Sequence, residues 1–514
     1  MYQKFLNVKW KLNKQIYKSK GNLLFVDRGR FYPAFVFTFL ACAFSKKYKL
    51  NNIILTDLNN DSSIVKIYKS LGFNMFLKSF DKFFFLKFKF FFKALYISII
   101  TSIKVYNKGF FWFIKEFKIN NIPLGDLIYD LFIRTNKNFV KSKPDIFFFK
   151  LLFKSIFRFL VIKNHIKENN IKFIFCCTEF YAGNDGLSLR IASFRNIKNV
   201  IVWHDSIGNL KVIENMKKII FFKGPHSHYR NRSLIKNIKK KIISKRLIDN
   251  FIEDRKNFKT VNTYTINSFK KANKHSKKKT INFLNTIKKK KKKIGLFACH
   301  ALSDAAHGLG INYAFSSYYE QLKLTLDFLD RNYDSSTIWI FKAHPSSREL
   351  KEEDTIKNLV KSYKNKRLII CPLKIKTKDL MSVSDYVISG RGTISLEAVC
   401  EGKISINCGF SAFSDLDLLY EAKSQNEYFN WLKNLKNLKK PNESTINRAR
   451  KVMYLLENNF LDEKIVNKKI AKYKINKIFN KYVEDKNFLS KMYLENFKAE
   501  NKLDNLVNLL SKSI

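Results

Sequence analysis

The feature that most constrains this chain is a regular alternation of short apolar runs with segments of helical periodicity. "NLLFVDRG" (22–29) and "NNIILTDLN" (51–59) each end in polar residues and lead into a helical stretch. The pattern recurs at "IKFIFCCTEFYAGND" (171–185) and "VIVWHDSIG" (200–208). Strands that alternate with helices are typical of a parallel sheet covered by helices on both faces. The first part of the chain is therefore predicted to be an α/β domain.

The same alternation restarts after six consecutive lysines in "IKKKKKKIGLF" (287–297). Six like charges repel one another and do not pack, so this run is interpreted as a solvated boundary. Five further strands are predicted, at 294–300, 337–344, 367–372, 385–390 and 403–409, with helices between them.

A chain of 514 residues is longer than one hydrophobic core usually serves, so at least two large domains are expected. We predict an N-terminal Rossmann-like lobe over 1–215 and a Lys-rich helical insertion or linker over 216–292. A C-terminal Rossmann-like lobe over 293–430 and a helical tail over 431–514 complete the prediction. A protein of this kind binds its ligand in the cleft between lobes, at the carboxyl ends of the strands.

The formal net charge of +55 suggests a polyanion partner, but the composition behind it weakens that interpretation. Only 16 of the 97 basic residues are Arg, and the abundant Lys accompanies abundant Asn, Ile and Phe. This pattern is typical of an A/T-rich genome that places Lys wherever a solvated residue is needed. Surface lysines are therefore favoured over a nucleic-acid groove, although the charge excess should still attract anionic lipid or acidic glycans.

The chain is expected to be cytoplasmic. Its seven cysteines are odd in number and contain no CxxC pair, which favours reduced thiols. The N-terminal 21 residues lack the apolar core of a signal peptide. The most lipid-like stretch, 83–103, is broken by Lys87, Lys89 and Lys93, and its longest uncharged run is too short to span a bilayer. Two interpretations stay open for it: a helix packed in the fold, or one at a membrane surface with snorkelling lysines.

Three predicted strands in the second lobe end in polar residues that are candidates for catalysis or ligand binding. In "FACHALSDAAHG" the strand is followed by His300, Asp304 and His307. His300 and Asp304 are candidate catalytic residues, although residues four apart could also satisfy one another locally. Zinc is not expected, because no fourth ligand is indicated.

The second strand end is "FKAHPSS", with Lys342, His344, Pro345, Ser346 and Ser347. Side chains two apart on a strand project to the same side, so Lys342 and His344 could meet one anion there. The alternative is that His344-Pro345 only stops the strand.

The third strand end, in "SDYVISGRGTISLEAVCEG", turns directly into a helix that carries Glu397. A helix N-terminus offers free N–H groups to a phosphate, although the sequence is neither a Walker loop nor GxGxxG and could be an ordinary turn. Polar ends at consecutive turns of one sheet together favour a nucleotide monophosphate or diphosphate. The turn residues are Ser389, Gly390, Arg391, Gly392 and Thr393.

Polar residues also follow the strands of the first lobe, and any of them could act as a general base on an acceptor hydroxyl. For "WHDS" a capping turn is an equally good interpretation. The candidates are Asp27, Arg28 and Arg30, then Glu179 and Asp185, then His204, Asp205 and Ser206.

The order "ACHALSDAAHGLG", "FKAHPSS" and "DLMSVSDYVISGRGTISLEAVCEGKISINCG" resembles the capsule-polysaccharide biosynthesis glycosyltransferases and the related lipopolysaccharide, Kdo- and CDP-glycerol-transferring families. "FKINNIPLGDLIYDLFIRTN" (117–136) is similar to a stretch in the N-terminal halves of such proteins. The resemblance covers 294–410 firmly and 20–215 loosely. It implies the GT-B fold, with two Rossmann-like lobes, and a bacterial enzyme of surface-glycan assembly.

The resemblance also implies roles for individual residues. Lys342 and His344 would bind the donor phosphate, Thr393 and its neighbours would hold phosphate at the helix start, and Glu397 would hold the ribose. Loss of the nucleotide would be assisted by Lys342, His344 and Arg391 without a metal ion.

The expected function is therefore transfer of a sugar, with a CMP-sugar favoured as donor, to a glycan or lipid-linked acceptor. No cofactor is expected, and the chain would sit peripherally on the anionic inner-membrane surface. The alternatives are a CDP-glycerol-type glycerophosphotransferase, a nucleotide-sugar epimerase of the same fold, and a non-catalytic polyanion-binding protein.

Overall fold

The computed structural model divides into two compact units, each described here by itself. The N-terminal unit takes in described parts of 1–131 and 142–222, and the C-terminal unit described parts of 132–141 and 223–459. The described residues are 20–27, 41, 45, 47–59, 62–70, 73, 75–79, 88–136, 143–176, 181–204, 210–213, 243–256, 277–288, 292–307, 313–332, 336–372, 375–411 and 413–458.

The N-terminal unit is built on a six-stranded sheet in the order β3-β2-β1-β6-β7-β8. This is the doubly wound order, in which the chain starts at the centre and extends to each edge in turn. All neighbours are parallel except β7 and β8, which are antiparallel. Its strands are β1 (Asn22–Val26), β2 (Asn51–Leu55), β3 (Met75–Leu77), β6 (Ile171–Cys176), β7 (Lys198–His204) and β8 (Leu210–Ile213).

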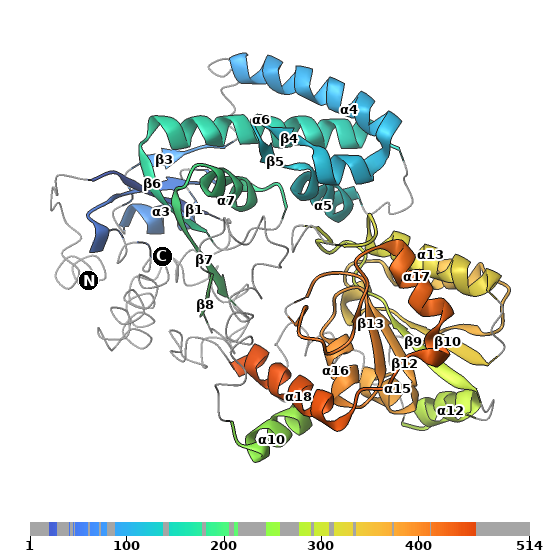
Figure 1. Ribbon diagram of the computed structural model, residues 1–514. Helices are drawn as coiled ribbons and strands as arrows, with labels where there is room; N and C mark the ends of the chain where they lie inside the picture. Colours follow the sequence, from blue (N-terminus) through green and yellow to red (C-terminus); the bar gives the residue numbers. More distant parts are fainter. Residues whose placement is uncertain are drawn as a thin grey trace. The chain divides into compact units, whose positions relative to one another are not determined.

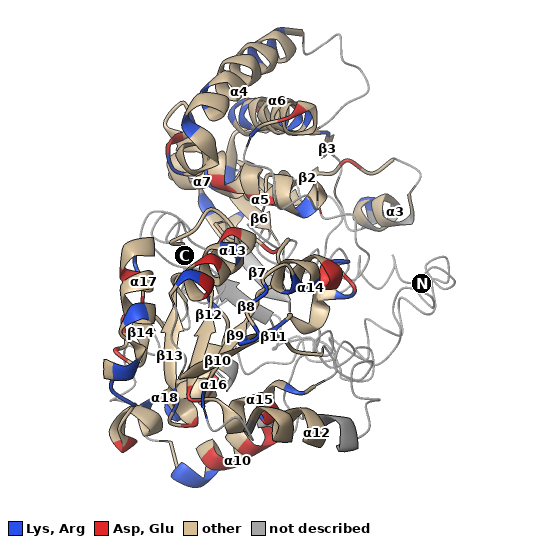
Figure 2. Cartoon of the chain, turned by 90° about the vertical axis from the view of Figure 1, so that its right-hand side faces the viewer, with Lys and Arg blue, Asp and Glu red and all other residues tan. Residues whose placement is uncertain are grey.

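Long helices cover this sheet, and α6 lies between α4 and the sheet in both views (Figures 1 and 2). A two-stranded ribbon joins α4 to α5. The elements are α3 (Ser63–Ser70), α4 (Phe88–Glu116), β4 (Lys118–Ile119), β5 (Ile122–Pro123), α5 (Gly125–Asn136), α6 (Ile146–Glu168) and α7 (Asn184–Phe194).

The "GDLIYD" stretch begins α5 and has a structural role, because its Asp126 pairs with a residue of α7. The guanidinium of Arg190 on α7 donates to both carboxylate oxygens of Asp126, at 3.0 and 2.6 Å, and also to the carbonyl oxygen of Pro123, at 2.8 Å. Both side chains are at most 4% exposed. Gly125 allows α5 to begin close to α4, because a Cβ there would lie 1.8 Å from the carbonyl oxygen of Phe113. The motif therefore ties α5 to α7.

The C-terminal unit repeats the doubly wound order as β11-β10-β9-β12-β13-β14, with every neighbouring pair parallel. The sheet is buried on both faces, which explains the continuous apolar runs of its central strands. The predicted α/β fold class with two Rossmann-like lobes is thus confirmed. The strands are β9 (Lys293–Ala298), β10 (Thr337–Lys342), β11 (Leu368–Ile370), β12 (Tyr386–Ser389), β13 (Ile404–Asn407) and β14 (Tyr420–Glu421).

The helices of this unit come from the predicted insertion (216–292), the predicted C-terminal lobe (293–430) and the predicted helical tail (431–514). Residues of α10 pack with α16 and α18 in one apolar cluster, and Ile287 of α12 packs with β9 and α15 in another. The predicted boundaries at 215, 292 and 430 stay predictions. The helices are α10 (Lys245–Lys256), α12 (Lys277–Lys288), α13 (Tyr318–Arg331), η3 (Pro345–Ser347), α14 (Glu353–Lys361), α15 (Thr377–Val383), α16 (Ile394–Cys400), α17 (Gln425–Lys433), η4 (Leu435–Asn437) and α18 (Glu443–Asn458).

One helix starts later than the sequence indicates. Helical periodicity suggests a start at Tyr313, but α13 begins at Tyr318. Ser317 caps it by accepting from the backbone N–H of Glu320, at 3.1 Å, while Tyr313 forms an isolated bridge to Gly409. That bridge joins distant parts of the chain, so local periodicity does not reveal it.

Candidate functional site

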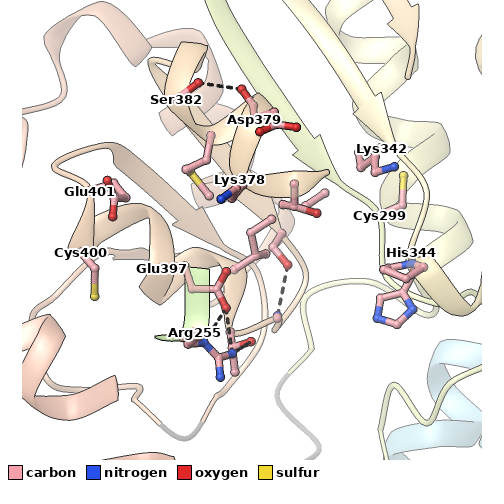
Figure 3. Close-up of a pocket in the computed structure, with 18 of the residues that line it drawn as sticks. Arg255, Cys299, Lys342, His344, Lys378, Asp379, Ser382, Glu397, Cys400 and Glu401 are labelled. Atoms are coloured by element: carbon pink, nitrogen blue, oxygen red, sulfur yellow. Dashed lines mark hydrogen bonds and ion pairs between the residues drawn. The ribbon is translucent and has the colours of Figure 1, made fainter. Parts of the chain in front are cut away.

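A cavity of about 480 Å³ lies in the C-terminal unit, at the carboxyl ends of β9, β10 and β12. The order of the sheet reverses between β9 and β12, and ligands of doubly wound sheets bind at this switch point. The volume is in the range of small-molecule sites. Figure 3 shows Lys342, Cys299 and His344 on one side and Arg255 and Glu397 on the other.

Lys342 and His344 both line this cavity, as does Pro345. Lys342 is the last residue of β10, and it is 4% exposed. Its ammonium donates to the carbonyl oxygen of Pro372, at 3.2 Å, and burial lowers its pKa. The ammonium therefore belongs to the wall of the cavity, where a positive charge would attract an anion.

The imidazole of His344 is neutral and is oriented by the backbone. Its Nδ1 accepts from the N–H of Ser346, at 3.2 Å, so the ring proton is assigned to Nε2. The pKa of His344 is lowered to about 4, mainly by burial and to a smaller extent by the nearby His300. Ser346 itself is buried and serves to hold His344. His344 thus offers a neutral N–H donor above about pH 5.

His300 also lines the cavity and lies beside Asp304, as the sequence suggests. Its ring stacks on Tyr318 with centroids 4.1 Å apart and lies 5.8 Å from the ring of His344. Its Nδ1 is 3.7 Å from Oδ2 of Asp304, whose side chain is 43% exposed. Burial lowers the pKa of His300, and the Asp304 carboxylate partly opposes this. Neutral His300 can therefore accept a proton and share the resulting charge with Asp304.

The thiol of Cys299 is adjacent to these groups but is not a nucleophile. Burial raises its pKa to about 12, so the thiol stays protonated at neutral pH. A thiol in that state is unreactive, because the thiolate is the nucleophilic form.

Only some residues of the third strand end reach the cavity. Ser389, Gly392, Thr393 and Glu397 line it, and Oγ of Ser389 accepts from the N–H of Gly392, at 3.1 Å.

Gly390 and Arg391 are not among the lining residues. A Cβ at Gly390 would lie 2.9 Å from the ring of Tyr318, and the guanidinium carbon of Arg391 lies 5.5 Å from the ring centroid of Tyr313. Both residues therefore pack against aromatic rings.

Arg255 completes the opposite wall, and the sequence analysis missed it. Its guanidinium donates twice to Oε1 of Glu397, at 3.1 and 2.8 Å, and its Nη2 lies 3.4 Å from the hydroxyl of Thr393. It comes from α10, within the Lys-rich stretch expected to be an insertion or linker. No local motif marks it, because the pairing joins residues 142 positions apart.

Glu352 is a second residue that the sequence analysis missed. Its fully buried carboxylate accepts from the backbone N–H groups of Leu302 and Ser303, at 2.8 and 2.9 Å. Burial raises its pKa, and these hydrogen bonds oppose the shift. Glu352 thereby anchors the loop that carries His300 and Asp304.

Replacing Glu352 by alanine should leave two buried N–H groups without an acceptor and lower unfolding stability by about 2–4 kcal/mol. Chemical denaturation measures the loss. Glu353→Ala is the matched control: Glu353 pairs with Arg348 at 2.9 Å, but Arg348 is 56% exposed, so a loss under about 1 kcal/mol is expected. Equal losses in the two variants would show that Glu352 does not anchor the loop.

The remaining candidates belong to the N-terminal unit. Asp185 is buried in the first turn of α7. Asp27 accepts from the hydroxyls of Thr56 and Tyr68, which fits a structural role. The backbone of His204 ends β7, but its side chain and Asp205 lie outside the described residues, as do Arg28, Arg30, Glu179 and Ser206. Their predicted roles stay predictions.

In the part of the chain that the structure describes, no group of three or more His, Cys, Asp or Glu side chains is placed to hold a metal ion. Within the same residues, no helix is both long and apolar enough to cross a membrane.

Residues 232–442 match the sequence family described as capsule polysaccharide biosynthesis protein. This part of the chain is thus similar in sequence to that family. The resemblance inferred from the motifs is therefore confirmed, and the family segment includes Arg255, β9 to β14 and the turns that line the cavity. The looser resemblance over 20–215 lies outside the match. No curated protein matches the sequence.

Several solved structures match this chain at low similarity. A glycosyltransferase from Rickettsia africae is 11% identical, with 91% of this chain and 100% of that chain covered and a TM-score of 0.26. A UDP-GlcNAc 2-epimerase from Methanocaldococcus jannaschii is 11% identical, with 84% and 98% covered and a TM-score of 0.25. The Kdo 2,4 transferase KpsC from Thermosulfurimonas dismutans is 12% identical, with 55% and 79% covered and a TM-score of 0.30. Likeness at this level carries no argument about activity.

Proposed function

We propose that the chain is a glycosyltransferase of bacterial surface-glycan assembly that uses a nucleotide-activated sugar, with a CMP-sugar favoured. The observation that supports this most is the pairing of Lys342 and His344 in the lining of one cavity, at the switch point of the sheet. An ammonium and a neutral N–H donor there suit a phosphate oxygen. The cavity belongs mostly to the segment that matches the capsule polysaccharide biosynthesis family.

In the proposed reaction, an acceptor hydroxyl attacks the anomeric carbon while the bond from that carbon to the phosphate oxygen breaks. The nucleotide leaves with the bonding electron pair. Lys342 and the Nε2–H of His344 would stabilise the charge that develops on the departing phosphate, so that the step needs no metal ion. Glu397, in its pair with Arg255, would face the ribose.

His300 is the group that we propose as acceptor of the hydroxyl proton, because it lines the same cavity and its lowered pKa keeps it neutral. Asp304 would stabilise the imidazolium that forms. The N-terminal unit supplies the alternative bases, Asp185, His204 and Asp205. The acceptor would be a glycan or a lipid-linked precursor.

The proposed location is the cytoplasmic side of the inner membrane, with peripheral attachment. The charge excess supports it, since a net charge of +55 attracts the protein to anionic lipid headgroups. This attraction acts over about 8–10 Å at physiological salt and should weaken as salt is added.

Calorimetric titration of the full chain with CMP, CDP, UDP and GDP tests the donor proposal. Binding of CMP or CDP in preference to the other two is expected. Binding of none would overturn it in favour of a polyanion-binding protein. Product analysis with the matching activated sugar then separates three reactions: sugar transfer to an acceptor, transfer of glycerol phosphate from CDP-glycerol, and epimerisation without an acceptor. Either of the last two would overturn the glycosyltransferase assignment.

A further inference from the structure

Helix α4 presents large apolar side chains to solvent along one face. Phe88, Phe92, Tyr96, Ile99, Ile103 and Tyr106, here named the α4 stripe, are 46–66% exposed. Their spacing of four, four, three, four and three residues keeps them on a single side of the helix.

The opposite side of α4 is already occupied by the fold. Ala94, Ser98, Thr101 and Val105 are buried and repeat with the same helical spacing, half a turn away from the α4 stripe. Helix α4 packs against α6, which runs beside it in Figure 1. The stripe is therefore a surface of its own and not the edge of the core.

The charges carried by α4 itself are basic except at its C-terminal end. Lys89, Lys93 and Lys104 are exposed, and each follows a residue of the α4 stripe by one position, so it lies about a quarter of a turn from that residue. Glu116 at the end of α4 is the one acidic residue in the helix. In Figure 2 blue segments recur along α4 and along α6 beside it.

Two aromatic rings of α4, one of them in the α4 stripe, each have a lysine ammonium over the ring. The ammonium of Lys143 lies 4.3 Å from the ring centroid of Tyr106 and donates to its hydroxyl, at 3.2 Å, and the ammonium of Lys115 lies 4.2 Å from the ring centroid of Phe111. Rings and lysine stems thus form one amphipathic layer with its charges at the margin.

We propose that the α4 stripe inserts into the headgroup region of an anionic lipid bilayer, with the flanking lysines on lipid phosphates. Phe, Tyr and Ile beside lysines are the composition of helices that lie in the membrane interface. The complementarity of charge selects a lipid surface over an apolar protein groove. The inference deepens the proposed peripheral location and rests on it, because it adds apolar insertion to attraction by charge.

The test uses the full chain and sedimentation with phosphatidylcholine vesicles that contain roughly 30% phosphatidylglycerol. A variant with Phe92→Ser, Tyr96→Ser, Ile99→Ser and Ile103→Ser should lower the partition coefficient at least about tenfold. The control replaces Leu247 and Ile281, which are 54% and 46% exposed on α10 and α12, by serine and should partition like the wild type.

Fluorescence quenching and sedimentation velocity distinguish insertion into lipid from the alternatives. Brominated lipid should quench the fluorescence that Ile103→Trp adds to that of the wild type, and it should leave unchanged the fluorescence that Leu247→Trp adds. Wild-type partitioning of the stripe variant, or equal losses in the control, would overturn the proposal and leave attraction by charge alone. A wild-type dimer that the stripe variant breaks in sedimentation velocity, with unchanged partitioning, would assign the stripe to a second copy of the chain.

These measurements need no nucleotide, so failure of the donor proposal and failure of the lipid proposal are separable. The stripe variant should bind nucleotide with the same affinity as the wild type, because α4 belongs to the N-terminal unit and the cavity to the C-terminal unit. Loss of vesicle binding together with loss of folded structure in circular dichroism would overturn the interpretation of the stripe as a surface.

Discussion

Alanine at Asp126 is expected to destabilise the N-terminal unit by about 3–5 kcal/mol, because the guanidinium of Arg190 would remain buried without its carboxylate. The pair is bidentate, and both side chains are at most 4% exposed, so water cannot replace the missing oxygens. Denaturant unfolding gives the size of the loss. Hydrogen exchange of α5 and α7 shows whether it is confined to the helices that the pair joins.

The control for this prediction replaces both partners. Asp126→Leu combined with Arg190→Met should recover most of the loss, because an apolar pair of similar volume needs no compensating charge. A double variant as unstable as Asp126→Ala, or a loss under about 1 kcal/mol in the single variant, would show that the pair is not what joins α5 to α7.

Alanine at Lys342 or at His344 should each weaken nucleotide binding and slow transfer by about 10- to 100-fold. Each removes one charge-assisted hydrogen bond, worth about 1.5–3 kcal/mol. The double variant should lose at least about 100-fold if both groups contact one phosphate. Calorimetry measures the affinity, and initial rates measure the transfer.

Two comparisons make this prediction specific. His344→Gln should recover part of the loss, since an amide can also donate a neutral hydrogen bond. Lys361→Ala, on an exposed residue at the end of α14, should change nothing. Because the pKa of His344 is lowered to about 4, its donor form is unchanged from pH 6 to 8, and the ratio of wild-type to His344→Ala affinity should be flat over that range. Wild-type affinity in both alanine variants would remove the donor assignment.

The central strands of both sheets could be predicted closely from the sequence, whereas β3, β8 and β14 were not predicted. The apolar run expected at 294–300 is β9, Lys293–Ala298, and the run expected at 385–390 is β12, Tyr386–Ser389. A strand buried on both faces needs consecutive apolar residues. Such a run consists of neighbouring residues, so it can be recognised in the sequence. Lys342 and His344 both line the cavity, as strand alternation predicts, but β10 ends at Lys342 and His344 lies in the turn that caps η3.

For the 83–103 stretch, hydrophobic periodicity was not sufficient to predict the environment of the helix. Its residues that belong to α4 are apolar on both sides of the helix, so periodicity could not choose between a packed helix and one at a membrane surface. The structure shows one side packed on α6 and the α4 stripe exposed. Residues 83–87 lie outside the described part of the chain.

Local sequence patterns were sufficient to predict the central strands, the two parallel-sheet units and the polar strand ends, because each of these depends on neighbouring residues. Which polar groups meet could be learned only from the folded chain. It joined Arg255 to Glu397 across 142 positions and Glu352 to the loop of His300, and it turned Gly390 and Arg391 toward Tyr318 and Tyr313. Such contacts depend on how distant segments pack together, and no local pattern in the chain records that packing.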